Sequence, residues 1–260
     1  MLSLVAYYGA KPAALAELIQ TLQQELTDKL GENFLPYALE QVHATIIGCE
    51  GTRDDRGIIN HWFASLREET RYIDFTGLID YLQQTPHLPL EITFSGYQPE
   101  RDYGFLSRQQ HPRDRSFSIQ VVKSQTSTNQ TTKNQNPTEP TGIPVLLGWS
   151  MENELITQAI DTLRRDCQQF NLLHKYHAKP EDLDNDLYLR LGTIKGIEPR
   201  ELNAINQQII CQLQQAIPTR ISLSKDDLAI VNYQELSLPT SSTKVHKLQN
   251  LRENPERLVG

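Results

Sequence analysis

The sequence has little of what marks several common protein classes. Its 260 residues include only three cysteines, and their wide spacing without a CxxC pair favours neither a disulfide framework nor a zinc site. We expect Cys49, Cys167 and Cys211 to be reduced thiols in the core. No apolar run approaches the roughly 20 residues that a membrane-spanning helix needs, and the N-terminus lacks the regions of a signal peptide. We therefore expect a cytoplasmic protein with no membrane partner.

A strongly basic surface is also missing. The formal net charge is −7, whereas a protein that grips long nucleic acid without sequence preference needs a basic stripe that displaces counterions. A short nucleotide or an RNA end in a locally basic cleft remains compatible with this charge. The sequence has no Walker A, GxGxxG, GxSxG or HExxH motif. Nucleoside triphosphatases, dinucleotide-dependent oxidoreductases, serine hydrolases and zinc proteases therefore lose their usual support.

The spacing of apolar residues predicts the order of the elements. Helical spacing predicts helices over residues 12–27, 54–66, 75–83, 152–170 and 198–217. Alternating spacing and short apolar runs predict strands over residues 2–8, 40–48, 88–94, 117–121, 143–149, 187–191, 219–224 and 228–236. Both ends of the chain read strand–helix–strand. We therefore expect an α+β fold with two pseudo-symmetric lobes of antiparallel-rich sheet and outer helices around a central cleft.

Two segments are too polar to belong to a packed core. Residues 123–142 contain no large apolar side chain, and such a segment cannot bury enough surface to offset the entropy lost on ordering. We expect a disordered insert there, joining two neighbouring strands. Residues 239–260 are expected to form a mobile C-terminal tail. The chain is thus predicted to hold one bilobal domain over residues 1–238.

The most informative segment is the predicted strand that runs from Gln41 to Gly48. Because side chains alternate along a strand, His43 and Thr45 point to the same side. An imidazole can move a proton near neutral pH, and a neighbouring hydroxyl can donate a hydrogen bond to the same phosphate group. The alternative interpretation is a half-buried strand that carries one polar histidine.

With this motif after a strand and a helix near the N-terminus, the chain resembles the 2H phosphoesterase family over roughly residues 2–236. This family is also called LigT-like, or RNA 2′,3′-cyclic phosphodiesterase. The resemblance implies two lobes, each adding a strand with a hydrophobic-His-x-Thr/Ser-hydrophobic motif to a shared cleft. It also implies a hydrolase in which one histidine acts as general base and the other protonates the leaving oxygen, without a metal or other cofactor. The expected partner is a nucleotide or an RNA end that carries a phosphate ester.

The second motif departs from the family pattern. The expected position lies between Asp186 and Gly196, where a strand is followed by a Lys-Gly turn. Matching the alternating apolar residues puts Tyr188 at the position of the histidine and Arg190 at that of the threonine or serine. A tyrosine with a pKa of about 10 is a poor base but can serve as an acid. An arginine can hold phosphate oxygens in a fork but cannot exchange protons.

These residues define the expected site. His43, Thr45 and Tyr188 are the catalytic candidates, and Thr45 and Arg190 are the candidates for phosphate binding. Because losing one acid–base partner typically costs on the order of 10²–10⁴ in rate, two hypotheses stay open beside an active phosphodiesterase. One is an inactive module that binds a nucleotide, RNA or a protein partner. The other is an unrelated α+β protein in which His43 is structural.

Three further groups of residues have two interpretations each. His174 and His177, on the loop before the second motif, either replace the missing histidine or are solvated. The segment from Arg101 to Arg115 interleaves basic and aromatic side chains, which suits single-stranded nucleic acid. Its acidic residues equally fit a solvated hairpin loop. Trp62 and Phe63 match the inner stripe of a helix and are expected in the core.

Overall fold

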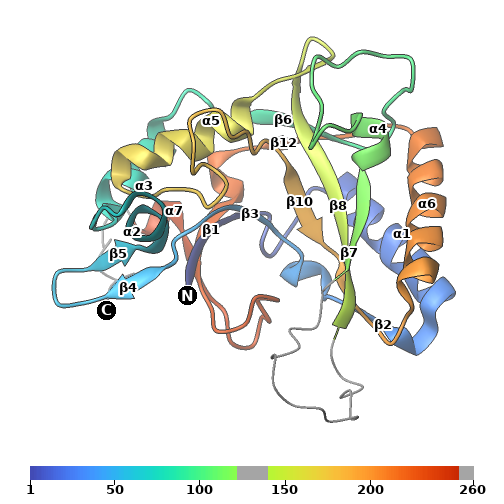
Figure 1. The fold of residues 1–260 in the computed structure, drawn as a ribbon, viewed down its shortest axis with the longest axis horizontal. Coiled ribbons are helices and arrows are strands. Elements are labelled where there is room, and N and C mark those ends of the chain that lie inside the picture. The colour runs from blue at the N-terminus through green and yellow to red at the C-terminus, as the bar shows by residue number, and fades with distance from the viewer. Residues whose placement is uncertain (122–139, 252–260) are drawn as a thin grey trace.

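The computed structural model describes residues 1–121 and 140–251, and Figure 1 shows helices on both flanks of a large sheet. The helices are α1 (Ala13–Leu30), α2 (His61–Arg67), α3 (Phe75–Gln84), α4 (Pro112–Arg115), α5 (Ala159–Asp166), α6 (Pro199–Gln215) and α7 (Leu248–Leu251). The strands are β1 (Leu2–Ala6), β2 (Phe34–Pro36), β3 (Ala44–Gly48), β4 (Gly51–Arg53), β5 (Ile58–Asn60), β6 (Leu90–Phe94), β7 (Phe117–Val121), β8 (Pro140–Glu152), β9 (Leu155–Ile156), β10 (Leu187–Arg190), β11 (Gly192–Lys195), β12 (Thr219–Leu223), β13 (Leu228–Asn232) and β14 (Lys244–Lys247).

One sheet of twelve strands runs through the described part of the molecule. Its main path has the order β12–β6–β8–β10–β3–β1–β13–β14, and β4 pairs with β5 in a separate hairpin. All the strand pairs within residues 1–121 and 140–251 are antiparallel. The α+β class predicted from the sequence is confirmed.

The sheet has two related halves that meet where β3 pairs with β10. Outward from this join, the strands are β3, β1 and β13 on one side and β10, β8 and β6 on the other. In each half a helix lies between the two inner strands in the sequence, as β1–α1–β3 and β8–α5–β10. The third strand of each half is exchanged: β6 follows α3 but pairs with β8, and β13 follows α6 but pairs with β1.

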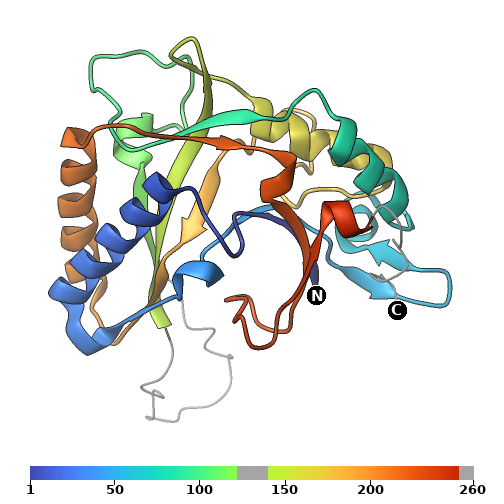
Figure 2. The same ribbon diagram turned by 180° about the vertical axis from the view of Figure 1, so that it is seen from behind.

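The helices cover the two flanks of the sheet. Figures 1 and 2 show α1 and α6 side by side on one flank, and α2, α3, α5 and α7 gathered on the other. A hydrogen bond of 3.1 Å from Lys29 Nζ to Gln208 Oε1 connects α1 and α6. The buried face of α1 has the spacing expected of an amphipathic helix, with Leu15, Ile19, Leu22, Leu26 and Leu30 pointing inward.

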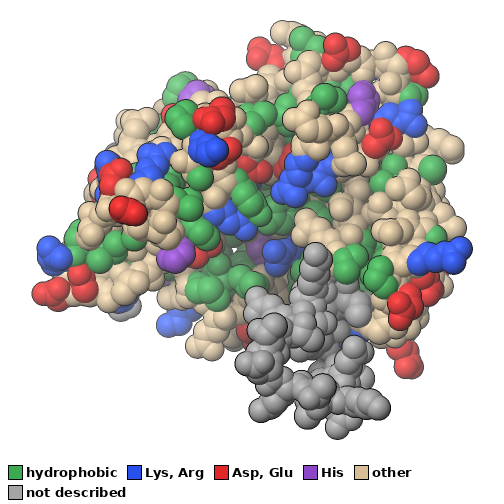
Figure 3. Space-filling model, viewed as in Figure 1, with side chains coloured by type: hydrophobic (Ala, Val, Ile, Leu, Met, Phe, Trp, Pro, Cys, Tyr) green, Lys and Arg blue, Asp and Glu red, His purple; other side chains and the backbone are tan. Residues whose placement is uncertain are grey.

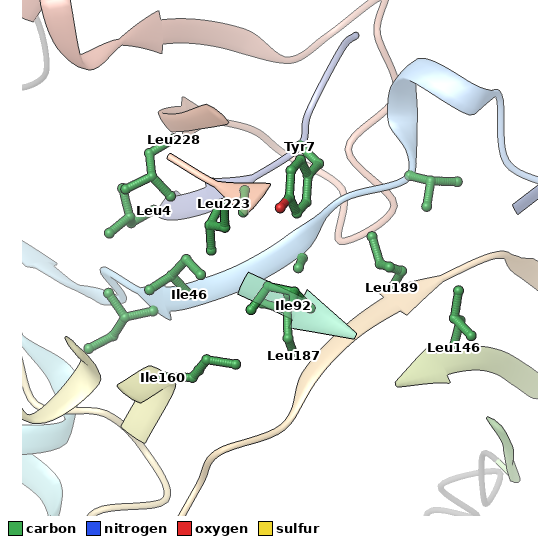
Figure 4. Close-up of a cluster of buried hydrophobic side chains, with 14 of the residues drawn as sticks. Leu4, Tyr7, Ile46, Ile92, Leu146, Ile160, Leu187, Leu189, Leu223 and Leu228 are labelled. Atoms are coloured by element: carbon green, nitrogen blue, oxygen red, sulfur yellow. The ribbon is translucent and has the colours of Figure 1, made fainter. Parts of the chain in front are cut away.

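The largest of three hydrophobic clusters in the described residues contains side chains from both halves. Figure 4 shows Ile46 of β3, Leu187 of β10 and Ile160 of α5 in one part of this cluster, and Leu189 of β10 farther along, toward Leu146 of β8. Because side chains alternate along a strand, burying these residues turns the intervening side chains of β3 and β10 to the opposite face. That opposite face carries the candidate site.

Two predicted helix boundaries are wrong. Ile58 and Ile59 lie in β5, because the Asn60 side chain accepts a hydrogen bond from the Phe63 amide and caps a helix that begins one residue later. The helix predicted over residues 152–170 begins at Ala159. Before it, β8 extends to Glu152, and two residues with positive φ at 153 and 154 turn the chain into β9.

The polar segments and cysteines also differ in part from expectation. The predicted insert at 123–142 lies outside the described residues except for its last three, which begin β8. Within the predicted tail, residues 244–247 pair with β13, and Leu248 and Leu251 are buried, so this part is folded. Cys49 and Cys167 are buried as expected, whereas Cys211 is exposed on α6. No helix in the two described ranges has the length and apolar character to cross a bilayer.

Candidate functional site

The join between β3 and β10 sets the geometry of the site. Ala44 lies opposite Leu189 in antiparallel register, and both side chains are fully buried on the core side. The residues that flank this pair therefore point to the other face. They are His43, Thr45, Tyr188 and Arg190, and all four line one cavity. The structure thus brings together the four site residues predicted from the sequence, while their roles stay predictions.

The cavity has a volume of about 100 Å³. Besides the four residues at the join, its lining comes from β1, from the segments around α2 and His174, and from the chain after β13. The residues concerned are Ser3, Val5, Gly48, Glu50, Trp62, Arg164, His174, Lys175, Tyr176, Asp184, Tyr233, Leu236 and Leu238. Figure 3 shows a hollow near the middle of this face with basic and histidine side chains inside and hydrophobic ones around it. Ordinary small-molecule pockets are roughly 300–1,000 Å³, so this cavity holds only one small group of a larger ligand.

His43 is positioned as a neutral base. Its Nδ1 lies 2.8 Å from the carbonyl oxygen of Gln41. A carbonyl only accepts, so Nδ1 carries the proton and Nε2 keeps its lone pair. Burial lowers the pKa of His43 to about 4; the hydrogen bond to Gln41 opposes this shift, and the positive charges of Arg190 and Lys11 add to it. The imidazole is therefore unprotonated at neutral pH and able to accept a proton.

The other three residues at the join offer polar groups without partners. Within residues 1–121 and 140–251, the Arg190 guanidinium has neither an ion pair nor a hydrogen bond. The side-chain hydroxyls of Thr45 and Tyr188 likewise have no hydrogen-bond partner in the described part of the chain. All three side chains are half-buried. A half-buried guanidinium without a carboxylate, next to two hydroxyl donors, favours an anion in the cavity.

Arg164 of α5 fastens the two central strands behind the site. Its guanidinium is 1% exposed and donates to the carbonyl oxygens of Ile46 at 2.8 Å and Thr45 at 3.2 Å on β3. It also donates to the carbonyls of Asp184 at 2.7 Å and Asp186 at 3.1 Å, just before β10, and to the Asp184 carboxylate at 3.1 Å. Arg164 therefore connects the backbone of β3 with the segment that leads into β10.

Arg164 is not among the site residues predicted from the sequence. One signal was available: Arg164 lies four residues after Ile160 and next to Leu163, on the apolar stripe of the helix. A cation at such a position predicts a buried partner. It does not say which carbonyls the cation binds.

His174 lies in the cavity but is not a free acid. Its Nδ1 accepts a hydrogen bond from the Tyr176 amide at 3.3 Å, and its Nε2 lies 3.5 Å from the Asp184 carboxylate. Burial, followed by the charge of Arg164, lowers the pKa of His174 to about 2. A neutral imidazole with both nitrogens engaged cannot protonate a leaving group at neutral pH. This geometry argues against His174 as the replacement acid.

His177 is placed away from the cavity. It is fully buried, and its Nε2 lies 2.8 Å from Asp161 Oδ1. The same carboxylate accepts from the Asp184 amide at 2.7 Å and from Arg165 Nε at 2.6 Å. His177 therefore fixes the loop before β10 and is neither solvated nor a member of the site, contrary to both interpretations of the sequence.

Trp62 belongs to the cavity and not to the core. It is half-buried at the start of α2, and its indole Nε1 donates to Glu50 Oε2 at 3.1 Å. Phe63, the next residue, is 1% exposed and packs inside as predicted. Helical periodicity predicted both Trp62 and Phe63 on the inner face because the predicted helix began before Asn60, whereas α2 begins after this cap. Glu50, which the sequence analysis did not identify, holds the indole in place.

The segment from Arg101 to Arg115 is divided among several partners. Arg101 pairs with Glu154 at 3.0 Å, and Arg115 is buried against Asp186 at 3.1 Å. These two side chains are structural. Arg108 alone among the basic residues of this segment reaches an aromatic residue of the cavity: its guanidinium carbon lies 5.9 Å from the centre of the Tyr176 ring. The segment therefore serves mainly the fold.

The charges around the cavity do not cancel. Asp184 is matched by Arg164, and burial raises the pKa of its carboxyl. Arg190 and Lys175 have no carboxylate partner in the described ranges, while Glu50 accepts from an uncharged indole. The described residues contain no group of three or more His, Cys, Asp or Glu side chains arranged to hold a metal ion.

Comparison with known proteins gives distant likeness in structure alone. No protein-family model matches the chain, and no curated protein matches it. Among solved structures, the chain is similar to the crystal structure of TT0787 of Thermus thermophilus, with 12% identity, 94% of this chain and 92% of that chain covered, and a TM-score of 0.44. A likeness of this size assigns no role to any residue.

Proposed function

We propose that the cavity binds the phosphate ester of a nucleotide or an RNA end, as in a 2H-phosphoesterase-like protein with an altered second half-site. One observation carries this proposal: His43, Thr45, Tyr188 and Arg190 line one small cavity, and the Thr45 and Tyr188 hydroxyls and the Arg190 guanidinium have no hydrogen-bond or ion-pair partner among the described residues. An anion with two or more acceptor oxygens, such as a phosphate ester, would accept hydrogen bonds from the guanidinium and from the hydroxyls together.

The proposed reaction is hydrolysis of a 2′,3′-cyclic phosphate. Arg190 grips two phosphate oxygens and Thr45 donates to one of them, which holds the phosphorus in place. His43 Nε2 takes a proton from a water as the water oxygen bonds to phosphorus. The bond from phosphorus to one ribose oxygen breaks, and the Tyr188 phenol supplies the proton to that oxygen. The product is a ribose phosphate monoester.

A second candidate function is binding without turnover. Arg190 occupies the position at which the resembled family has a hydroxyl, and His174 is neutral with both nitrogens engaged. The cavity therefore has a base and an anion grip but only a phenol as acid. This arrangement suits a module that holds a nucleotide, an RNA end or a partner protein.

Hydrolysis of the four nucleoside 2′,3′-cyclic monophosphates tests the first candidate. We expect turnover that falls by about 10²–10⁴ in His43→Ala and is unchanged in Arg200→Ala, an exposed substitution on α6. Calorimetric binding of the same nucleotides separates the two candidates. Binding that Arg190→Gln weakens, with no turnover above that of His43→Ala, supports the binding module. Absence of both binding and turnover contradicts the proposal.

A further inference from the structure

An exposed aromatic ring with two cations lies at the mouth of the cavity. Tyr176 lines the cavity and is 45% exposed. The Nζ of Lys175, which also lines the cavity, lies 4.6 Å from the centre of the Tyr176 ring. The guanidinium of Arg108 lies 5.9 Å from the same ring. We call Arg108, Lys175 and Tyr176 the rim cluster.

The two cations of the rim cluster keep a net positive charge. Arg108 approaches Asp186 at 3.8 Å, but that carboxylate already accepts from Arg115 at 3.1 Å, Trp149 at 2.8 Å and Ser107 at 2.6 Å. Arg108 is therefore an extra cation beside a carboxylate that Arg115 has neutralised. Its side chain is 56% exposed. Lys175 has no carboxylate partner in the part of the chain that the structure describes.

Size connects the rim cluster to the cavity. A cavity of about 100 Å³ encloses one small group, such as a phosphate ester. The remainder of any nucleotide must extend past the residues at its mouth, and Tyr176 and Lys175 belong to that mouth. An exposed ring offers a stacking face to a base, and flanking cations offer contacts to a phosphate.

We propose that the rim cluster is a second subsite, which takes the next nucleotide of a single-stranded RNA whose terminal phosphate lies in the cavity. Tyr176 stacks on the base, and Lys175 and Arg108 bind the linking phosphate. This inference rests on the proposed function and narrows it: the ligand is an RNA end, and a free nucleotide fills only half of the site. One ring and two cations suit a single strand, and the overall charge of −7 argues against a surface that grips a duplex.

Affinity for two matched ligands tests the subsite. The ligands are adenosine 2′,3′-cyclic phosphate and the dinucleotide ApA that ends in the same cyclic phosphate, and binding is measured by calorimetry with His43→Ala protein to prevent turnover. We expect the dinucleotide to bind about 5-fold or more tightly, as one base–aromatic stack provides. Its affinity should fall more steeply with salt, by about 0.7 in the slope of log K against log salt for the added phosphate.

Variants in the same background identify the residues. Tyr176→Ala should abolish the advantage of the dinucleotide, measured as the ratio of its affinity to that of the mononucleotide for the same variant, whereas Tyr176→Phe should keep that ratio because it keeps the ring. Lys175→Ala and Arg108→Ala should each reduce the extra salt dependence. Arg200→Ala, which removes an exposed cation on α6, should change neither ligand's affinity.

The outcomes separate this inference from the function on which it rests. Equal affinity for the two ligands, or an advantage that survives Tyr176→Ala, overturns the subsite while binding of the mononucleotide continues to support the cavity proposal. Loss of both affinities in Arg190→Gln supports the cavity alone. If neither ligand binds, both the proposed function and the subsite are wrong.

Discussion

Ala44 lies opposite Leu189 at the point where the two halves of the sheet meet. Both side chains are fully buried, so this pair aims its flanking residues at the cavity. Next to the pair, Arg164 donates hydrogen bonds to backbone carbonyls of β3 and of the segment just before β10. The alignment of the two half-sites thus depends on a few contacts, and the predictions below address them.

Replacing Arg164 should destabilise the whole fold. Arg164→Met leaves the carbonyls of Thr45 and Ile46 without their donor and Asp184 without its counter-ion. Breaking a buried pair by removing one partner typically costs about 3–5 kcal/mol. Urea unfolding at pH 7 measures the loss. The control is Arg200→Met on the surface of α6, which should stay within about 0.5 kcal/mol of the unsubstituted protein; an equally small effect of Arg164→Met would refute the bracing role.

The pH below which kcat/KM falls on the acid side should be unusually low. The pKa of His43 is lowered to about 4, chiefly by burial, so the base is unprotonated across the neutral range. We expect kcat/KM to rise with pH around pH 4 and then to stay level up to about pH 7. A pH series with a short assay at each value checks this. A midpoint near 6.5, the ordinary value for histidine, would show that His43 is not buried as described or is not the base.

The charge at position 190 should contribute to the lowered pKa of His43. The Arg190 guanidinium contributes to lowering that pKa, after burial. Arg190→Gln removes the positive charge and should raise the pKa of His43 toward its ordinary value, whereas Arg190→Lys keeps the charge and should leave it low. NMR titration of the His43 ring measures the value in each variant. Identical titrations in the glutamine and lysine variants would mean that the two side chains do not interact.

The same substitutions should separate the contribution of the charge at position 190 to anion affinity from that of the forked shape of the guanidinium. Arg190→Lys keeps the charge but lacks the fork that a guanidinium presents to two oxygens. We expect nucleotide affinity to fall about 10-fold or more in Arg190→Gln, since a hydrogen bond to a charged group contributes about 1.5–3 kcal/mol. Arg190→Lys should fall between the glutamine variant and the unsubstituted protein. Calorimetry with a nucleoside 2′,3′-cyclic monophosphate decides, and unchanged affinity in both variants would exclude Arg190 from the site.

Two histidines with lowered pKa values, His43 and His174, should make the fold sensitive to mild acid. The pKa values of His43 and His174 are lowered to about 4 and about 2, while in the unfolded chain each lies near 6.5. Between these values the unfolded state binds more protons, so stability is fully present above pH 6.5 and falls as the pH decreases. At pH 5 the loss is about 2 kcal/mol per histidine.

Urea unfolding at pH 7 and pH 5 measures this loss. His174→Gln should remove roughly half of the difference between the two pH values. His61→Gln replaces an exposed histidine and should leave the difference intact. Equal stability of the unsubstituted protein at both pH values would contradict the burial of the two imidazoles.

Alternation along the chain was enough to predict where the site lies. The pattern around His43 and around Tyr188 places one polar face on each strand, and the structure puts both faces in one cavity. Alternation could not reveal that Arg164 joins those strands, because helical spacing indicates a buried face but not the acceptors that it meets. Trp62 was predicted in the core for a similar reason. The apolar residues before Asn60 suggested an earlier helix start, whereas the hydrogen bond to the Asn60 side chain sets the start at His61.

Short strands were the other feature that could not be predicted from the sequence. The three residues of β2 and the four of β11 contain too few positions for alternation to be visible, yet they pair with each other at the edge of the sheet. The four residues of β14 read as a polar tail, because their position depends on the backbone of β13 and not on buried side chains. Backbone pairing of this kind leaves little trace in composition.

The exchange of β6 and β13 between the halves has a consequence for synthesis. As the chain leaves the ribosome, β1 is made first, whereas its outer neighbour β13 is among the last strands to be made. Leu2 therefore cannot pair with Asn232 until most of the chain has been synthesised. Until then β1 has one unpaired edge, which other chains could extend. Cutting the protein between its halves would give two fragments that each lack a strand held by the other. Neither fragment should fold alone, and the two should recover the structure only when they associate.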